Sequence, residues 1–281
     1  MKITLLGTGG PRPDPGRHGP ATLVQIGDEH VLFDCGRGVV LQLVRAGVPL
    51  DRVNPVFVTH HHYDHIGDLA DVMLSTWLQG RPGALRIFGP PGTAAIVSAL
   101  LGQVYDKDTE FRVKGEPAVG GWKPVEATDV LAGLVHDAGP WKVSTETVVH
   151  GHGLNLPGAF KHRWVCLGYR LEAEGKVVAI SGDTVACGGL DRLARDADVL
   201  VQCCYLARAE ITTPHLEHVA RHTLACSDTV GAIARQARVK KLVLTHFRQK
   251  PDAMLEAIAG DVARDWDGPI VLGRDLLEVV V

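Results

Sequence analysis

The feature that most constrains this chain is a cluster of ionisable side chains directly after an apolar segment. Residues 56–59 read Val-Phe-Val-Thr, and His60, His61, His62, Asp64 and His65 follow within six positions. A continuous apolar run is typical of a strand that is buried on both faces of a layered α/β protein. In the extended segment after it, residues two positions apart point to the same side, so His60 and His62 can bind one metal ion. Asp64 and His65 lie at the turn into a helix and can reach a second ion.

Zinc is the metal that this set of side chains predicts. Mixed imidazole and carboxylate ligands suit zinc best, and manganese or iron is also compatible. A solvent-exposed histidine-rich tract is the alternative, but such tracts lie at termini and lack an aspartate at fixed spacing. The chain has 14 histidines against 6 Phe and 4 Tyr, and histidine is the commonest metal ligand.

The remaining pattern predicts alternating strands and helices. Strands are expected at residues 2–6, 22–26, 31–33, 56–59, 85–88, 143–149, 165–171, 177–180, 199–201, 241–245 and 270–272. Helices are expected at residues 39–46, 68–78, 93–101, 191–195, 227–237 and 253–263. Interleaved strands and helices indicate α/β layers. No linker rich in Pro, Gly or Ser interrupts them, so residues 1–281 are expected to form a single domain.

Two strand ends resemble each other. Residues 56–60 are Val-Phe-Val-Thr-His, and residues 242–246 are Leu-Val-Leu-Thr-His. A polar residue at the end of a buried strand lies at the sheet edge, where α/β proteins place their sites. This echo predicts two half-domains packed about one shared site.

Composition and patterning exclude several classes of protein. The 281 residues carry a net charge of −3, with 46% hydrophobic and 22% charged residues, which excludes a disordered chain. No apolar run approaches the roughly 18 to 20 residues that span a membrane. The first residues run too soon into glycine and proline for a signal peptide. The six cysteines include no Cys-x-x-Cys pair, so we expect reduced thiols in a cytoplasmic protein.

The pattern His-x-His-x-Asp-His after an apolar strand resembles the metallo-β-lactamase superfamily. Further motifs agree along nearly the whole chain: Leu-Gly-Thr-Gly-Gly-Pro at 6–11, Leu-Phe-Asp-Cys-Gly at 32–36, Gly-Tyr-Arg at 168–170, Ser-Gly-Asp-Thr at 181–184 and the segment 242–247. Jointly they look like the branch that contains ribonuclease Z, arylsulfatase-like hydrolases and related phosphodiesterases. The resemblance implies a four-layer αββα sandwich with a dinuclear zinc site at one edge of the sheets.

The resemblance also implies the metal ligands. The family's ligands carry over to His60, His62 and His150 for the first metal, to Asp64, His65 and His246 for the second, and to Asp183 as a bridge between the two. The third histidine of the first metal has a competitor in His152, and His150 is favoured because it follows a strand directly. Asp34 matches a family aspartate that supports the metal loop, or it caps a turn.

A mechanism follows from this implied site. Two metals roughly 3.5 to 4 Å apart can hold a bridging hydroxide at neutral pH, and the hydroxide attacks phosphorus, sulfur or carbon. A metal stabilises the charge that develops on oxygen, and Asp64 can accept a proton from the nucleophile.

The proton donor for the leaving group is less clearly defined. In ribonuclease Z a glutamate and a second histidine act together, but the glutamate position here reads Cys203. His222 is the candidate acid, although it reads equally as a surface histidine. His215 and His218 compete with it, and Glu217 could replace the missing carboxylate.

The substrate is predicted from a missing segment and from charge. Many ribonucleases Z grip tRNA with a long arm between the Gly-Tyr-Arg and Ser-Gly-Asp motifs, and here only ten residues, 171–180, separate them. No basic stretch replaces the arm, and the net charge is negative. We therefore expect a small-molecule substrate, such as an aryl ester, a sulfate or a phosphodiester-like compound, and no nucleic-acid or membrane partner. Trp122, Trp141, Phe160 and Trp164 either shape an apolar pocket or pack in the core.

Two other functions stay open. One is a ribonuclease Z-like tRNA 3′-processing endonuclease, and the other is a non-catalytic metal-binding scaffold, against which the complete ligand set argues. A homodimer is also expected. The helix at 68–78 offers apolar side chains to a pocket or to the dimer interface, namely Leu69, Val72, Met73, Leu74 and Trp77.

Overall fold

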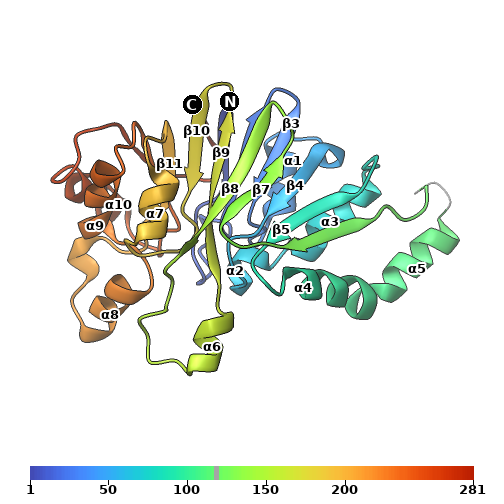
Figure 1. Ribbon diagram of the computed structural model, residues 1–281, viewed down its shortest axis with the longest axis horizontal. Coiled ribbons are helices and arrows are strands. Elements are labelled where there is room, and N and C mark those ends of the chain that lie inside the picture. Colours follow the sequence, from blue (N-terminus) through green and yellow to red (C-terminus); the bar gives the residue numbers. More distant parts are fainter. Residues whose placement is uncertain (117–119) are drawn as a thin grey trace.

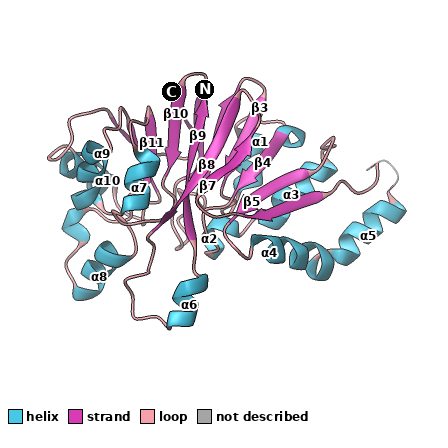
Figure 2. Cartoon of the chain, in the orientation of Figure 1, coloured by secondary structure: helices cyan, strands magenta, loops and turns pink. Residues whose placement is uncertain are grey.

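Two seven-stranded sheets pack face to face in the computed structural model, which describes residues 1–116 and 120–281, and helices cover their outer faces (Figures 1 and 2). The first sheet has the order β14 (Leu277–Val280), β1 (Lys2–Gly7), β2 (Ala21–Ile26), β3 (Glu29–Phe33), β4 (Val53–Phe57), β5 (Leu85–Gly89), β6 (Val125–Asp129). The second has the order β13 (Ile270–Leu272), β12 (Leu242–Thr245), β11 (Val199–Cys203), β10 (Lys176–Ile180), β9 (Cys166–Ala173), β8 (Trp141–Val148), β7 (Gly133–Asp137). The expected αββα sandwich is confirmed.

Each sheet repeats one topology. β1, β2 and β3 pair antiparallel, and β3 to β6 then pair parallel. In the same way β8, β9 and β10 pair antiparallel, and β10 to β13 pair parallel. Two half-domains are thus present, but the counterpart of β4 in this repeat is β11, not β12. The sequence echo between residues 56–60 and 242–246 therefore compared strands that are not equivalent.

Helices separate the strands of the parallel parts, and one helix, α6, lies between the antiparallel strands β8 and β9. The first half contains α1 (Val39–Arg45), α2 (Tyr63–Ile66), α3 (Leu69–Leu78), α4 (Thr93–Ala99) and α5 (Asp106–Gly115). The second half contains α6 (Gly158–Arg163), α7 (Gly188–Ala194), α8 (Pro214–His222), α9 (Ser227–Gln236) and α10 (Asp252–Val262). α5 follows α4 through a π-helical turn and projects away from the body of the molecule (Figure 1). No helix of the described ranges is long and apolar enough to cross a membrane.

The core consists of three apolar layers. Residues alternate between them along each strand, because successive side chains point to opposite faces. In β3, for example, Val31 and Phe33 pack between the sheets, whereas Leu32 packs beneath the outer helices. Phe57 is fully buried between the sheets, and its ring lies 5.3 Å from Phe33 and 5.2 Å from Tyr169. Burial on both faces explains why the central strands read as continuous apolar runs.

Helix α3 belongs to the core. Leu69, Val72, Met73 and Trp77 are all buried, and the first three pack against the first sheet. Four of the five side chains that were offered to a pocket or to a dimer interface are thus packed within one chain, and the fifth, Leu74, is half-buried. The amphipathic pattern of the helix reflects packing on its own sheet.

Candidate metal centre

The seven implied ligands meet at one edge of the two sheets. His60 and His62 follow β4, and Asp64 and His65 lie in α2 directly after them. The other three follow strands of the second sheet, namely β8 (His150), β10 (Asp183) and β12 (His246). This edge is the lower one in Figure 1, where α2, α6 and α8 lie. The carboxyl ends of β4, β10 and β12 point to it, which is the usual place for a site in an α/β protein.

The first group of ligand atoms comprises three imidazoles. The Nδ1 atom of His62 lies 3.0 Å from Nε2 of His60 and 3.1 Å from Nε2 of His150. Together with Asp183, these atoms all lie within 4.8 Å of one another. Two ligand atoms bound to a tetrahedral zinc ion at about 2.05 Å are about 3.3 Å apart. The spacing of the three nitrogens therefore fits a shared cation.

The second group comprises Asp64, His65 and His246. Nε2 of His246 lies 3.3 Å from Nε2 of His65 and 3.4 Å from Oδ2 of Asp64. These atoms also lie within 4.8 Å of one another. A second cation of similar size fits between them.

Asp183 connects the two groups. Its Oδ2 atom lies 3.2 Å from Nε2 of His246 and 3.4 Å from Nε2 of His65, both in the second group. The same oxygen lies 3.9 Å from Nε2 of His60 and of His150, in the first group. One carboxylate placed among four imidazoles has the geometry that a bridge between two metals requires.

Several buried polar atoms at this edge lack a hydrogen bond. Oδ2 of Asp64, Oδ1 of Asp183 and Nδ1 of His246 have no partner among the described residues. A buried carboxylate oxygen without a partner costs free energy unless something else satisfies it. The residues present therefore fit a divalent cation.

A second set of hydrogen bonds orients the imidazoles. Nδ1 of His65 donates to Oδ2 of Asp34 at 2.7 Å, and Nδ1 of His150 donates to the carbonyl of Thr223 at 2.6 Å. Asp34 also accepts from the backbone N–H and the hydroxyl of Thr59, directly before His60. Such bonds select the tautomer that presents Nε2 to a metal. Asp34 thus supports the metal loop, as the resemblance implied.

Protonation states suit metal binding at most of these positions. Burial holds the pKa of His60 well below its ordinary value, and burial together with His150 lowers the pKa of His62 to about 4. Burial acts to raise the pKa of Asp183, but the imidazoles of His246 and His65 hold it well below its usual range. Metals bind neutral imidazole and ionised carboxylate. These three side chains are therefore in the binding form at neutral pH.

His65 differs from the other imidazoles. Burial acts to lower its pKa, but the carboxylates of Asp183 and Asp34 outweigh burial and raise the pKa well above its ordinary value. A metal that binds here would have to displace a proton.

The structure distinguishes the neighbouring histidines. His152 lies outside the cluster, where Nε2 is 2.8 Å from the carbonyl of Trp164 and Nδ1 accepts from the backbone N–H of His150. His61 points away from the metal groups, with Nε2 at 2.8 Å from the hydroxyl of Thr93. The cluster therefore contains His150 and neither of these two.

The predicted proton donor is not brought into the cluster. The ring of His222 packs against Gly153 and against His218, at 4.7 Å between ring centroids. The next two residues, Thr223 and Leu224, line the cavity beside the metal groups instead. A role for His222 as general acid gains no support from this geometry.

Cys203 is a structural thiol. It is buried, and its Sγ atom donates to the carbonyl and accepts from the N–H of Thr184, both at 3.4 Å. Burial raises the pKa of this thiol to about 12. A neutral thiol cannot replace the glutamate that the family carries at this position.

A cavity of about 330 Å³ opens beside the metal groups. Its lining residues are Pro11, His62, Tyr63, Asp64, His150, Asp183, Tyr205, Val219, Thr223 and Leu224. Arg12 and Arg248 lie close enough to lower the pKa of the Tyr205 phenol, against the larger effect of burial. Arg37 donates to the carbonyl of Pro11 at 3.3 Å. Three arginines from separate segments therefore lie next to Pro11 or Tyr205, two residues that line the cavity, and no stretch of the sequence revealed this.

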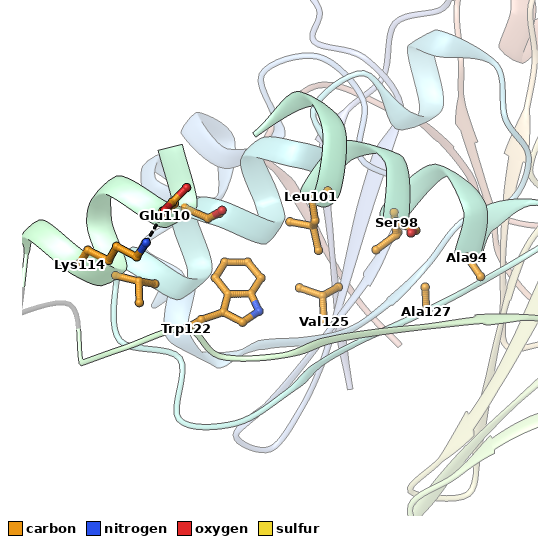
Figure 3. Close-up of a pocket in the computed structure, with 12 residues that line it drawn as sticks. Ala94, Ser98, Leu101, Glu110, Lys114, Trp122, Val125 and Ala127 are labelled. Carbon is orange, nitrogen blue, oxygen red and sulfur yellow. Dashed lines mark hydrogen bonds and ion pairs between the residues drawn. The ribbon is translucent and has the colours of Figure 1, made fainter. Parts of the chain in front are cut away.

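A larger cavity, of about 670 Å³, lies away from this chemistry. It is enclosed by α4, α5 and β6, and Figure 3 shows Leu101, Trp122 and Val125 in its wall. Glu110 and Lys114, both on α5, form an ion pair at its side. It contains none of the candidate metal ligands, so size alone does not identify the site of reaction.

The chain matches known proteins along its length. Residues 29–247 match the family described as the beta-lactamase superfamily domain. Ribonuclease Z of Mycobacterium bovis (strain BCG / Pasteur 1173P2) is 34% identical over 291 residues, which cover 100% of this chain and 98% of that protein. Ribonuclease Z of Mycobacterium marinum is 34% identical over 294 residues, covering 100% and 99%.

Solved structures share the fold. The short form of human tRNase Z superposes with a TM-score of 0.74 at 22% identity, covering 100% of this chain and 99% of that one. A metallo-beta-lactamase fold protein from Bacillus subtilis also has a TM-score of 0.74, at 18% identity and 99% and 98% coverage.

These relatives correct two expectations. The predicted small-molecule substrate and the exclusion of a nucleic-acid partner are wrong, because relatives that match the whole chain are ribonucleases Z. The error came from treating the short segment 171–180 and the net charge of −3 as evidence about the substrate. Net charge is a sum over the whole surface, whereas the arginines next to the cavity wall act locally. The expected family is confirmed: the chain belongs to the metallo-β-lactamase superfamily, on the branch that contains ribonuclease Z, and it is a metal-dependent hydrolase.

Proposed function

We propose that this protein is a tRNA-processing endonuclease of the ribonuclease Z type that works with two zinc ions. The observation that carries the proposal is the complete set of seven ligand side chains at one edge of the sheets, in a chain that is similar to ribonucleases Z over its full length. Four of the seven, His62, Asp64, His150 and Asp183, line the adjoining cavity. The arginines next to the lining residues Pro11 and Tyr205 add positive charge, which favours the binding of a phosphate backbone.

The ligand groups define what each residue would do. His60, His62 and His150 would hold one ion and Asp64, His65 and His246 the other, with Asp183 shared. Two divalent ions held there would supply an activated water molecule and would offset negative charge on the phosphate oxygens.

The protein's own side chains position the reaction. The hydrogen bonds from His65 to Asp34 and from His150 to Thr223 hold the imidazoles rigid, so little reorganisation accompanies substrate binding. Asp64 lies at the cavity wall, and its carboxylate would accept a proton from the attacking water. Trp164 donates through its indole N–H to the carbonyl of His150 at 2.9 Å and braces the same loop.

Cleavage of a precursor tRNA that carries a 3′ trailer tests the proposal. The zinc-loaded protein should release the trailer, and Asp64→Ala and His246→Ala should each reduce the rate by at least about 100-fold, in line with the loss of a central catalytic contribution. Asp106→Ala, at an exposed position of α5, is the matched control and should cleave normally. A folded, zinc-loaded protein that leaves the precursor intact would refute the proposal.

A further inference from the structure

Tyr63 occupies an unusual position at the candidate metal centre. It lies between the ligands His62 and Asp64, at the first residue of α2. Its side chain is 59% exposed and yet lines the cavity beside the metal groups. A small residue would connect the two ligands equally well, so the exposed aromatic ring is not needed for the loop.

The ring of Tyr63 is held in place. Its hydroxyl donates to the carbonyl of Pro11, and the guanidinium of Arg37 lies over the ring at 5.5 Å from its centroid. Arg37 is itself fixed, because it donates to the carbonyls of Pro11 at 3.3 Å and Gly10 at 3.2 Å. Arg37 forms no ion pair with a carboxylate of the described ranges, so its charge is available to a ligand.

An exposed ring with an arginine over it is a surface suited to single-stranded RNA. Proteins bind unpaired nucleotides by stacking bases on aromatic side chains and by contacting phosphates with Arg or Lys. Both elements occur here within one cavity wall. Because Tyr63 sits between two metal ligands, a base stacked on it would belong to a nucleotide next to the phosphate held by the metals.

We propose that Tyr63 and Arg37 form a stacking and cationic platform for the nucleotide adjacent to the scissile phosphate. This inference rests on the proposed ribonuclease function and specifies how the site holds the unpaired end of its RNA. Tyr63 provides the face for the base, and Arg37 fixes the ring and contacts the neighbouring phosphate.

The platform can be tested by binding, independently of turnover. The probe is a precursor RNA with a non-cleavable phosphonate at the scissile position and 2-aminopurine, in separate RNAs, on either side of it. Stacking on Tyr63 should quench the fluorescence of one of the two probes on binding to the zinc-loaded protein.

Substitutions then distinguish the contribution of the Tyr63 ring to RNA binding from that of the loop that carries it. Tyr63→Leu should abolish the quenching and raise Kd by about 5- to 150-fold, the range for loss of one stacked base. Tyr63→Phe keeps the ring and should keep the quenching. Arg37→Gln should weaken binding and reduce the slope of log Kd against log salt by about 1. Phe111→Leu, an exposed aromatic residue on α5, is the matched control and should bind normally.

Two outcomes would overturn the inference in different ways. If the unsubstituted protein cleaves precursor tRNA but Tyr63→Leu binds and quenches like it, the platform is refuted and the proposed function stands. If the unsubstituted protein neither cleaves nor binds the RNA, the proposed function fails and the platform fails with it. The zinc content of Tyr63→Leu must equal that of the unsubstituted protein, and a loss of zinc would refute a role limited to RNA binding.

Discussion

Asp34→Asn is expected to weaken metal binding without changing the backbone. Asp34 has a φ of +62°, a conformation that asparagine also tolerates, so the substitution introduces no new strain. The carboxylate accepts three hydrogen bonds, from the N–H of Thr59 at 2.7 Å, its hydroxyl at 2.9 Å and Nδ1 of His65 at 2.7 Å. The amide oxygen of asparagine can keep the bond from the N–H.

The bond to His65 cannot survive unchanged. The amide nitrogen is a donor, so it would pair with Nδ1 of His65 only if the ring proton moved to Nε2. Nε2 is the atom that faces the metal groups, and its lone pair would then be blocked. Loss of such a supporting partner typically costs 10- to 100-fold in metal affinity, which is about 1.4 to 2.8 kcal/mol.

Competition between the protein and a fluorescent zinc chelator measures this difference. Asp198→Asn is the matched control. Asp198 is also a buried carboxylate that accepts a backbone N–H, from Val177 at 2.9 Å, but it precedes β11 and so lies at the opposite end of the strands from the metal groups. Its zinc affinity should be unchanged. If Asp34→Asn binds zinc as tightly as the unsubstituted protein, the argument that Asp34 sets the tautomer of His65 is refuted.

Three further outcomes are expected. Phe57→Ala removes a fully buried ring that stacks on Phe33 and should lower the free energy of unfolding by about 3 to 5 kcal/mol; a loss below 1 kcal/mol in urea unfolding would contradict the packing. Cys203 and four of the other cysteines are buried, and burial raises the pKa of the Cys203 thiol to about 12. A thiol reagent at pH 8 should therefore modify only Cys187 in the native protein and all six cysteines in denaturant. Because Asp183 and Asp34 raise the pKa of His65, zinc binding near pH 7 should release a proton, and affinity should rise with pH; calorimetric titrations in two buffers that detect no proton release would contradict this.

Local sequence signals predicted the buried part of the fold. Strands such as β4 and β12 were found from the apolar runs at or near their ends, because a strand buried on both faces favours apolar residues. The bounds of β4, Val53–Phe57, begin three residues before the predicted 56–59. β6, β7 and β14 were missed, since these strands are partly exposed and alternate weakly. α5 was missed because its side chains are mostly polar or charged, with no residue buried.

The helix predicted at residues 227–237 begins at Ser227 in the structure, and tertiary contacts decide how its start is held. Cys226 occupies the N-cap position of α9, and the hydroxyl of Ser227 donates to Asp261 at 2.6 Å. A hydroxyl near a helix start has several partners to choose from, and only the packing of α10 against α9 decides between them.

The metal chemistry was determined largely by residues that are close in sequence. His60, His62, Asp64 and His65 fall within six positions, and the geometry of a strand end and one helical turn brings them together whatever surrounds them. Resemblance to a family then sufficed to propose the more distant ligands. The contacts that support these ligands and the residues that surround the site could not be predicted from neighbouring residues in this way.

Only the tertiary structure decided what surrounds the metals. It placed His150 in the ligand cluster and His152 outside it, and it lined the cavity with Thr223 and Leu224, while the ring of His222 packs against His218. It also brought the arginines at positions 12, 37 and 248 next to Pro11 and Tyr205 of the cavity wall, although net charge had argued against a nucleic-acid substrate. Electrostatic potential at a site depends on distances between side chains in space, and sequence separation carries no information about those distances until the chain is folded.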